Sequence, residues 1–167
     1  MSELFLLSVP SNLPISRIQY HREKRKGLAN YFDGEGSITI GKTFNNDGHH
    51  KSPTYFVYTQ VSATDRPLIQ EFYNYFKVGY FCLTIIKKKM ASERIFHFHW
   101  EAKGNQAITV LKILLPYFRL KKEQAELAIE FQENKIVRRY PKLNPDDLAF
   151  REKYRQLIRK CNRSSLL

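Results

Sequence analysis

The stretch that decides the fold is residues 27–40, Gly-Leu-Ala-Asn-Tyr-Phe-Asp-Gly-Glu-Gly-Ser-Ile-Thr-Ile. Its first half, residues 28–32, is mostly apolar and can form a helix. Gly34 and Gly36 supply the backbone freedom that ends a helix and turns the chain sharply. From residue 37 onward polar and apolar residues alternate, which is typical of a half-buried strand. The stretch therefore predicts a helix, an abrupt stop and a strand.

Two acidic residues, Asp33 and Glu35, lie at the predicted junction. A helix C-terminus carries unpaired carbonyl oxygens and a partial negative charge. A carboxylate beside it strengthens the attraction for a hard cation such as Mg²⁺ or Ca²⁺. The simpler interpretation is a glycine-capped turn with two solvated acids, and the pattern alone favours that interpretation.

Residues 28–36 resemble the signature of the LAGLIDADG homing endonucleases. The resemblance implies that motif helices pack against each other and that the acid next to last in the motif binds the catalytic metal. Glu35 matches that acid, and the Gly34 carbonyl matches a backbone ligand beside it. Asn30 stands where the family usually has a small glycine or alanine between the helices. The residues expected at this helix interface are Leu28, Asn30, Tyr31 and Asp33.

The composition favours a folded protein with a polyanionic partner. Lys and Arg number 28 against 16 Asp and Glu, which gives a formal net charge of +12. Such an excess favours nucleic acid, because each neutralised phosphate releases counterions. Apolar residues at 43% and aromatic residues at 14% argue against a disordered basic tail. The length of 167 residues suits one domain with a proper core.

The cysteines and the N-terminal sequence bear on the compartment. Cys82 and Cys161 are far apart and form no C-x-x-C pair, so they predict neither a disulfide framework nor a thiolate zinc site. The apolar residues 4–7 are too few for a signal peptide, and no run is long enough to span a membrane. We expect a soluble, intracellular protein, cytoplasmic or organellar and not secreted.

Hydrophobic periodicity predicts the remaining elements. Strands are expected at residues 37–44, 55–61, 80–86 and 94–100, and helices at 67–76, 107–118, 124–137 and 146–161. Asp65 should cap the helix that has Pro67 in its first turn, and Pro116 should break the next one. Two hairpins joined by a helix predict an α+β fold of αββαββα order, with a four-stranded antiparallel sheet covered by helices on one face.

The resemblance agrees with this order, since the family uses the uncovered sheet face as a saddle for DNA. Residues 1–15 are expected to form an irregular arm, residues 16–142 the endonuclease core, and residues 143–167 a C-terminal helix appended to the same domain. Residues 17–26 carry five basic residues and one acid and lead into the motif helix. This charged run is either a solvated face or a phosphate contact.

Strand parity assigns side chains to the two sheet faces. Ile38, Ile40 and Phe44 favour the core in the first strand, and Phe96, Phe98 and Trp100 share one face of the fourth. The second strand is apolar on both faces, and the family's register directs Phe56, Tyr58 and Gln60 towards DNA. A strand of about ten residues spans roughly 33 Å, close to one turn of B-DNA, and its polar side chains can meet base edges. The residues predicted to bind DNA are Ser37, Thr39, Lys42, Thr43, Asn45, Tyr58, Gln60, Thr84, Lys87, Lys88, Lys89, His97 and His99.

Two alternatives to base reading stay open at this point. Polar residues line the open face of any sheet, whether or not the sheet binds DNA. His97 and His99 could also form a metal-binding pair, although no third ligand is evident nearby in the sequence.

A second segment, residues 115–125, resembles the one that leads into a later helix in single-motif family members. There a lysine beside the active site organises water or stabilises charge, and Lys121 matches it. The alternative is an ordinary surface lysine at a helix start. Arg66, after the second strand, is expected to fill a basic position that the family often has there.

The resemblance implies a site-specific, intron-encoded DNA endonuclease that uses Mg²⁺, with Ca²⁺ or Mn²⁺ as other occupants of the metal site. Only one motif copy is present, and single-copy members act as homodimers, so that two chains supply the two Glu35 carboxylates. The expected substrate is double-stranded DNA, and the expected products carry short 3′ overhangs. Neither a membrane nor a small-molecule cofactor is expected as a partner. One alternative is a LAGLIDADG-type maturase that binds RNA and assists the splicing of group I or archaeal introns. The other is a non-catalytic basic nucleic-acid-binding module in which Glu35 is only a turn residue.

Overall fold

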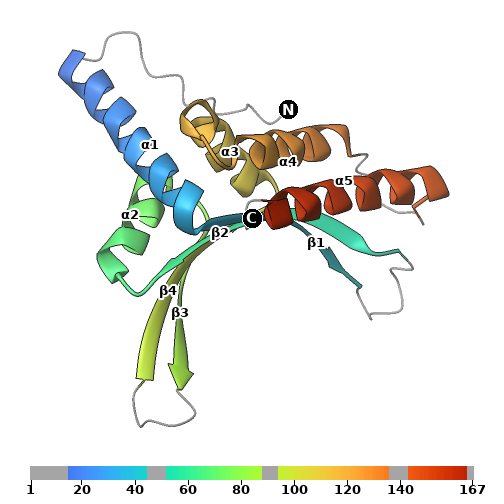
Figure 1. The fold of residues 1–167 in the computed structure, drawn as a ribbon, viewed down its shortest axis with the longest axis horizontal. Helices are drawn as coiled ribbons and strands as arrows, with labels where there is room; N and C mark the ends of the chain where they lie inside the picture. The colour runs from blue at the N-terminus through green and yellow to red at the C-terminus, as the bar shows by residue number, and fades with distance from the viewer. Residues whose placement is uncertain (1–14, 45–51, 88–93, 136–142, 165–167) are drawn as a thin grey trace.

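The computed structural model describes residues 15–44, 52–87, 94–135 and 143–164, which form helices around one antiparallel sheet (Figure 1). The elements in chain order are α1 (Ile15–Glu35), β1 (Gly36–Thr43), β2 (Thr54–Ala63), α2 (Arg66–Phe76), β3 (Tyr80–Lys87), β4 (Arg94–Lys103), α3 (Asn105–Leu114), the 3₁₀ helix η1 (Leu115–Tyr117), α4 (Lys122–Asn134) and α5 (Pro145–Ser164). The predicted α+β class is confirmed. The expected break at Pro116 is confirmed as well, because α3 gives way there to η1.

The sheet has four strands in the order β1-β2-β4-β3. Each hairpin pairs its own two strands, and β2 pairs with β4 to join the hairpins, all antiparallel. One transverse row crosses every strand, because Ser37 is paired with Gln60, Gln60 with Glu101, and Glu101 with Tyr80. The prediction that two hairpins form one antiparallel sheet is therefore confirmed.

Helix α1 runs without interruption from the basic run to the last acid of the motif, a length of 21 residues. The predicted abrupt stop and following strand are confirmed, but Gly34 and Gly36 do not use positive φ, since the described residues with positive φ are Lys77, Gly79 and Gly104. Gly34 is helical, and β1 begins at Gly36 directly after the helix. A Cβ atom at Gly36 would lie 2.4 Å from the Phe32 ring and 2.5 Å from its carbonyl oxygen. Glycine is therefore needed at position 36 because Phe32 leaves no room for a side chain.

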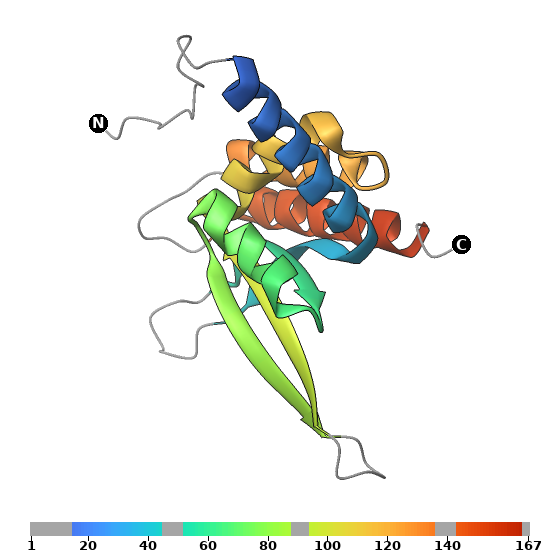
Figure 2. The same ribbon diagram turned by 90° about the vertical axis from the view of Figure 1, so that its left-hand side faces the viewer.

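The helices cover a single face of the sheet (Figures 1 and 2). Alternate strand residues turn inward and are buried, among them Ile38, Ile40, Val57, Val61 and Trp100. The helices pack Leu28, Phe32, Phe72, Leu111 and Phe131 against them. Trp100 donates its Nε1–H to the Val78 carbonyl at 3.0 Å, which satisfies the polar atom of the largest core side chain. None of the helices in the described part of the chain is both long and apolar enough to cross a membrane.

The β3–β4 hairpin extends beyond the helical layer (Figures 1 and 2). Leu83, Ile85 and Phe96 share the helix-side face by register, yet their exposed fractions are 49%, 47% and 47%. The predicted shared face of Phe96 and Trp100 is confirmed, but Phe96 is half exposed because no helix of the described residues reaches this part of the hairpin. Phe44 was expected in the core, but β1 ends before it and its side chain is 68% exposed.

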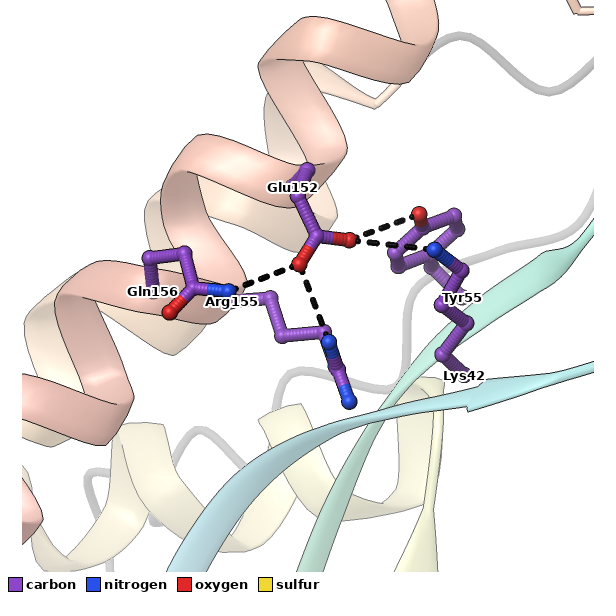
Figure 3. Close-up of polar contacts among 5 residues, drawn as sticks. All are labelled: Lys42, Tyr55, Glu152, Arg155 and Gln156. Atoms are coloured by element: carbon purple, nitrogen blue, oxygen red, sulfur yellow. Dashed lines mark hydrogen bonds and ion pairs between the residues drawn. The ribbon is translucent and has the colours of Figure 1, made fainter.

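Helix α5 is tied to β1 and β2 by Glu152 (Figure 3). This carboxylate accepts hydrogen bonds from the Tyr55 hydroxyl at 2.9 Å and from Lys42 Nζ at 3.3 Å. Gln156 and Arg155 donate to its other oxygen at 2.8 and 2.9 Å. These donors, Gln156 foremost, lower the pKa of Glu152 to about 2.

Candidate functional site

The C-terminal end of α1 is a bare surface with one carboxylate. Glu35, the last residue of the helix, is exposed, and so is Gly34 before it. A Cβ atom added at Gly34 would meet nothing within 4 Å, so this end of the helix is open to a ligand or a partner. Asp33 differs from both, because only 6% of its surface is exposed.

Asp33 binds the segment that precedes α4. Its two carboxylate oxygens accept the backbone N–H groups of Arg119 at 2.8 Å and Lys121 at 3.0 Å. Lys121 returns a bond, since its Nζ donates to the Asp33 carbonyl oxygen at 2.8 Å. We call these three bonds the Asp33 clasp. It places the Lys121 ammonium at the end of α1, two residues from Glu35, although Asp33 and Lys121 are 88 residues apart in sequence.

The charges at this end of α1 complement one another. A helix C-terminus attracts cations, and a lysine that bonds a last-turn carbonyl satisfies an otherwise unpaired acceptor. Tyr31 lies beside the acidic groups. Burial, and then the negative charges of Glu35 and Asp65, raise the pKa of the Tyr31 hydroxyl. The start of α2 is therefore near the end of α1, because Asp65 caps α2 by accepting the Leu68 N–H at 3.3 Å.

The sheet face opposite the helices, which we call the open face, carries polar and aromatic side chains. By register and burial its residues include Ser37, Thr39, Thr43, Phe56, Tyr58, Gln60, Tyr80, Thr84, His97, His99, Glu101 and Lys103. The predicted outward parity of β1, β2 and β4 is confirmed. His97 and His99 stack with their ring centroids 6.3 Å apart. In the described ranges, no three His, Cys, Asp or Glu side chains group together to hold a metal.

A hydrogen-bond network crosses the middle of the open face. The Tyr58 hydroxyl lies 2.6 Å from Glu101 Oε2 and 3.2 Å from Gln60 Oε1. Gln60 Nε2 lies 3.0 Å from His99 Nδ1, and Lys103 pairs with Glu101 Oε1 at 3.2 Å. Burial and the bond to Glu101 raise the pKa of Tyr58, while the Tyr58 and Lys103 donors lower the pKa of Glu101.

No protein-family model and no curated protein sequence matches the chain. Its structure, however, is similar to solved structures of homing endonucleases. One is I-CvuI with its DNA target in the presence of Ca, at a TM-score of 0.60 and 18% identity over 88% of this chain and 97% of that one. Another is the archaeal intron-encoded I-Vdi141I complexed with DNA, at a TM-score of 0.61 and 13% identity over 84% of each chain. A third is the LAGLIDADG homing endonuclease I-LtrWI bound to target DNA, at a TM-score of 0.51 and 14% identity over 69% of this chain and 39% of that one.

The chain has the LAGLIDADG homing-endonuclease fold. Within this fold α1 is the motif helix, and its signature residues 28–36 end where β1 begins. The resemblance read from those residues is therefore confirmed in the architecture.

The residues expected to be catalytic lie at three helix ends, with Glu35 at the end of α1, Lys121 just before α4 and Arg66 at the start of α2. Glu35 and Lys121 come together through the Asp33 clasp. Arg66 is exposed at the first residue of α2, next to Asp65. Sequence reasoning missed the clasp itself, because nothing in the motif indicates which backbone groups the Asp33 carboxylate will bind.

Two of the expected helix-interface residues are not available to a partner. Leu28 and Asp33 are only 2% and 6% exposed, since their side chains pack inside their own chain. Tyr31 is half-buried against Phe72, with 6.1 Å between ring centroids. Asn30 is exposed as expected. The exposed stripe of α1 here consists of Gly27, Asn30 and Gly34, at helical spacing.

The predicted DNA-binding residues divide into three groups. Those that lie on the open face are Ser37, Thr39, Thr43, Tyr58, Gln60, Thr84, His97 and His99. Lys42 does not lie on the open face, because it shares the helix-side parity of Ile40 and pairs with Glu152 (Figure 3). Asn45, Lys88 and Lys89 lie outside the described residues, and Lys87 is described only as the last residue of β3.

Glu101 and Lys103 are open-face residues that sequence reasoning missed. The fourth strand was expected to end at residue 100, whereas β4 continues to Lys103. Extending the alternation of His97 and His99 by two more steps would have found both residues.

Proposed function

We propose that this chain is a metal-dependent, site-specific DNA endonuclease that acts as a homodimer. The observation that carries the proposal is the Asp33 clasp, which holds the Lys121 ammonium beside the exposed Glu35 end of α1. A carboxylate and a cation kept together at a bare helix end suit the hydrolysis of a phosphodiester. The net charge of +12 and the polar open face support a DNA substrate.

Glu35 and the main-chain carbonyl of Gly34 would hold the divalent cation. The donor set fits, because Mg²⁺ and Ca²⁺ prefer carboxylate and carbonyl oxygens, and the missing side chain of Gly34 leaves room for an ion. When bound, the metal polarises the scissile phosphate and lowers the pKa of a coordinated water.

Lys121 has a separate task in this proposal. Its Nζ group has three donors and uses one on the Asp33 carbonyl, so that two can face the phosphate or the departing oxygen. Arg66, exposed at the start of α2, would add a second positive charge on the same side.

A homodimer follows from the single Glu35 in each chain. The exposed stripe of Gly27, Asn30 and Gly34 would meet the same stripe of a second copy, with Asn30 hydrogen-bonding across the contact. The chain spans 97% of I-CvuI but 39% of I-LtrWI, which supports one sheet per chain. Two open faces would then cover a long, nearly palindromic site, and two Glu35 ends would cut both strands across the minor groove, leaving short 3′ overhangs.

The test is Glu35→Gln, assayed on a library of random DNA sites with Mg²⁺ for cleavage and Ca²⁺ for binding. Cleavage should be abolished and binding retained, because the amide is a poor metal ligand of nearly the same shape. Glu23→Gln is the matched control, since Glu23 is exposed on the same helix and pairs with Lys26. Cleavage that survives Glu35→Gln, or binding that is lost with it, would exclude the enzyme assignment.

A further inference from the structure

Glu101 is the one acid among the described open-face residues, in a protein with a net charge of +12. It lies at the centre of the sheet, in the transverse row of Ser37, Gln60 and Tyr80. That row lies close to the proposed catalytic end, because Ser37 follows Glu35 by two residues. A carboxylate in this place faces whatever the sheet binds near the proposed cleavage site.

The Glu101 side chain is held in one position. Its Oε2 accepts the Tyr58 hydroxyl at 2.6 Å, its Oε1 pairs with Lys103 at 3.2 Å, and only 21% of the side chain is exposed. Two carboxylate oxygens offer about four acceptor sites, so each oxygen can still accept a further hydrogen bond. The two donors also favour the ionised form of Glu101, which can accept hydrogen bonds but cannot donate them.

A fixed carboxylate restricts what it can meet on DNA. It repels phosphates, so a favourable contact has to be with a base edge that donates. In the major groove the donors are the N4 amino group of cytosine and the N6 amino group of adenine. Adenine carries the N7 acceptor next to its amino group, and this lone pair would face a carboxylate oxygen. Cytosine presents the amino group with no acceptor beside it.

We propose that Glu101 is a specificity-determining residue that reads a cytosine in the major groove through its N4 amino group, with Tyr58 and Lys103 holding the carboxylate in place. The inference rests on the proposed function, since it requires that the open face binds duplex DNA. In a homodimer it predicts a cytosine at two symmetry-related positions, near the middle of the site.

The experiment selects binding sites from a pool of random DNA duplexes in the presence of Ca²⁺, using the full chain and Glu101→Gln. Wild type should enrich cytosine at one symmetric pair of positions. Glu101→Gln should shift those positions to adenine, because glutamine both accepts from N6 and donates to N7. The change in the ratio of cytosine to adenine should be about tenfold or more, with the other positions unchanged.

Two further variants make the test specific. Glu126→Gln removes an exposed acid of α4, on the helical side of the protein, and should leave every base preference unchanged. Tyr58→Phe removes the hydroxyl that holds Glu101, and should weaken the cytosine preference without replacing it by another base.

Each outcome separates this inference from the proposed function. If wild type enriches no sequence at all, the proposed DNA function fails. If wild type enriches a site but Glu101→Gln keeps all its preferences, weakens all of them equally, or changes a position that was not cytosine, this inference alone is overturned.

Discussion

Replacing Asp33 with asparagine tests the clasp that joins α1 to the segment before α4. The carboxylate is 6% exposed and accepts two backbone N–H groups, at 2.8 and 3.0 Å. The amide of Asp33→Asn has one oxygen and one NH₂, so one of the two N–H groups would face a donor. A lost charge-assisted hydrogen bond and an unsatisfied buried N–H together should lower the free energy of unfolding by about 3 kcal/mol.

Chemical denaturation of wild type and variant measures this loss directly. Asp65→Asn is the matched control, because Asp65 is exposed and accepts one N–H at 3.3 Å as the cap of α2. It should cost less than about 1 kcal/mol. A loss below about 1 kcal/mol for Asp33→Asn would refute the reasoning, since a buried carboxylate with two partners cannot be that easily replaced.

The same variant shows whether Asp33 acts through Lys121. Asp33→Asn should slow DNA cleavage and leave Ca²⁺-supported binding unchanged, because the ammonium loses its fixed position beside Glu35. In a Lys121→Met background Asp33→Asn should have little further effect on the cleavage rate. Rate losses that multiply in the double variant would show that Asp33 acts on the reaction independently of Lys121.

Three further outcomes are expected. Gly36→Ala should lower the free energy of unfolding by about 2 kcal/mol, as measured by chemical denaturation, because the methyl group would lie 2.4 Å from the Phe32 ring. Glu152 has a folded pKa of about 2 against an ordinary value of 4.5, so its stabilisation is present above pH 4.5 and is lost as the pH falls towards 2. Above pH 4.5 the wild type should be more stable than Glu152→Gln by about 1 kcal/mol, a small value because the Glu152 side chain is 35% exposed. The difference in melting temperature between the two proteins should disappear as the pH falls from 4.5 to 2. Gly34→Leu should give a monomer by sedimentation and should lose cleavage, and a cleaving dimer would contradict the proposed α1 interface.

Much of the fold could be predicted because its signals are local. The alternation of Ile38 and Ile40 determines which face of β1 is buried, and Asp65 with Pro67 determines where α2 begins. The motif helix and its strand follow from nine consecutive residues, 28–36, and the alternation after them.

The errors have a different origin, since they depend on partners distant in sequence. Lys42 was expected on DNA, but its partner Glu152 is 110 residues away and lies on the helical side. Asp33 was expected at an interface, but Arg119 and Lys121 occupy its carboxylate. Phe44 was expected in the core, but β1 ends at Thr43 and the Phe44 side chain is 68% exposed. Periodicity predicts the face of a residue but not what reaches that face.

Helix α5 covers both a backbone group at the edge of the sheet and part of the apolar core. β1 is an edge strand, and Asn162 donates to the Ile38 carbonyl at 3.1 Å, so α5 occupies a backbone group that would otherwise accept another strand. The same helix buries Ile158 and Tyr154 in the apolar core. A chain shortened before residue 143 would lose both protections at once. It would present a free strand edge beside a bare apolar strip, the combination that promotes intermolecular β-pairing and precipitation.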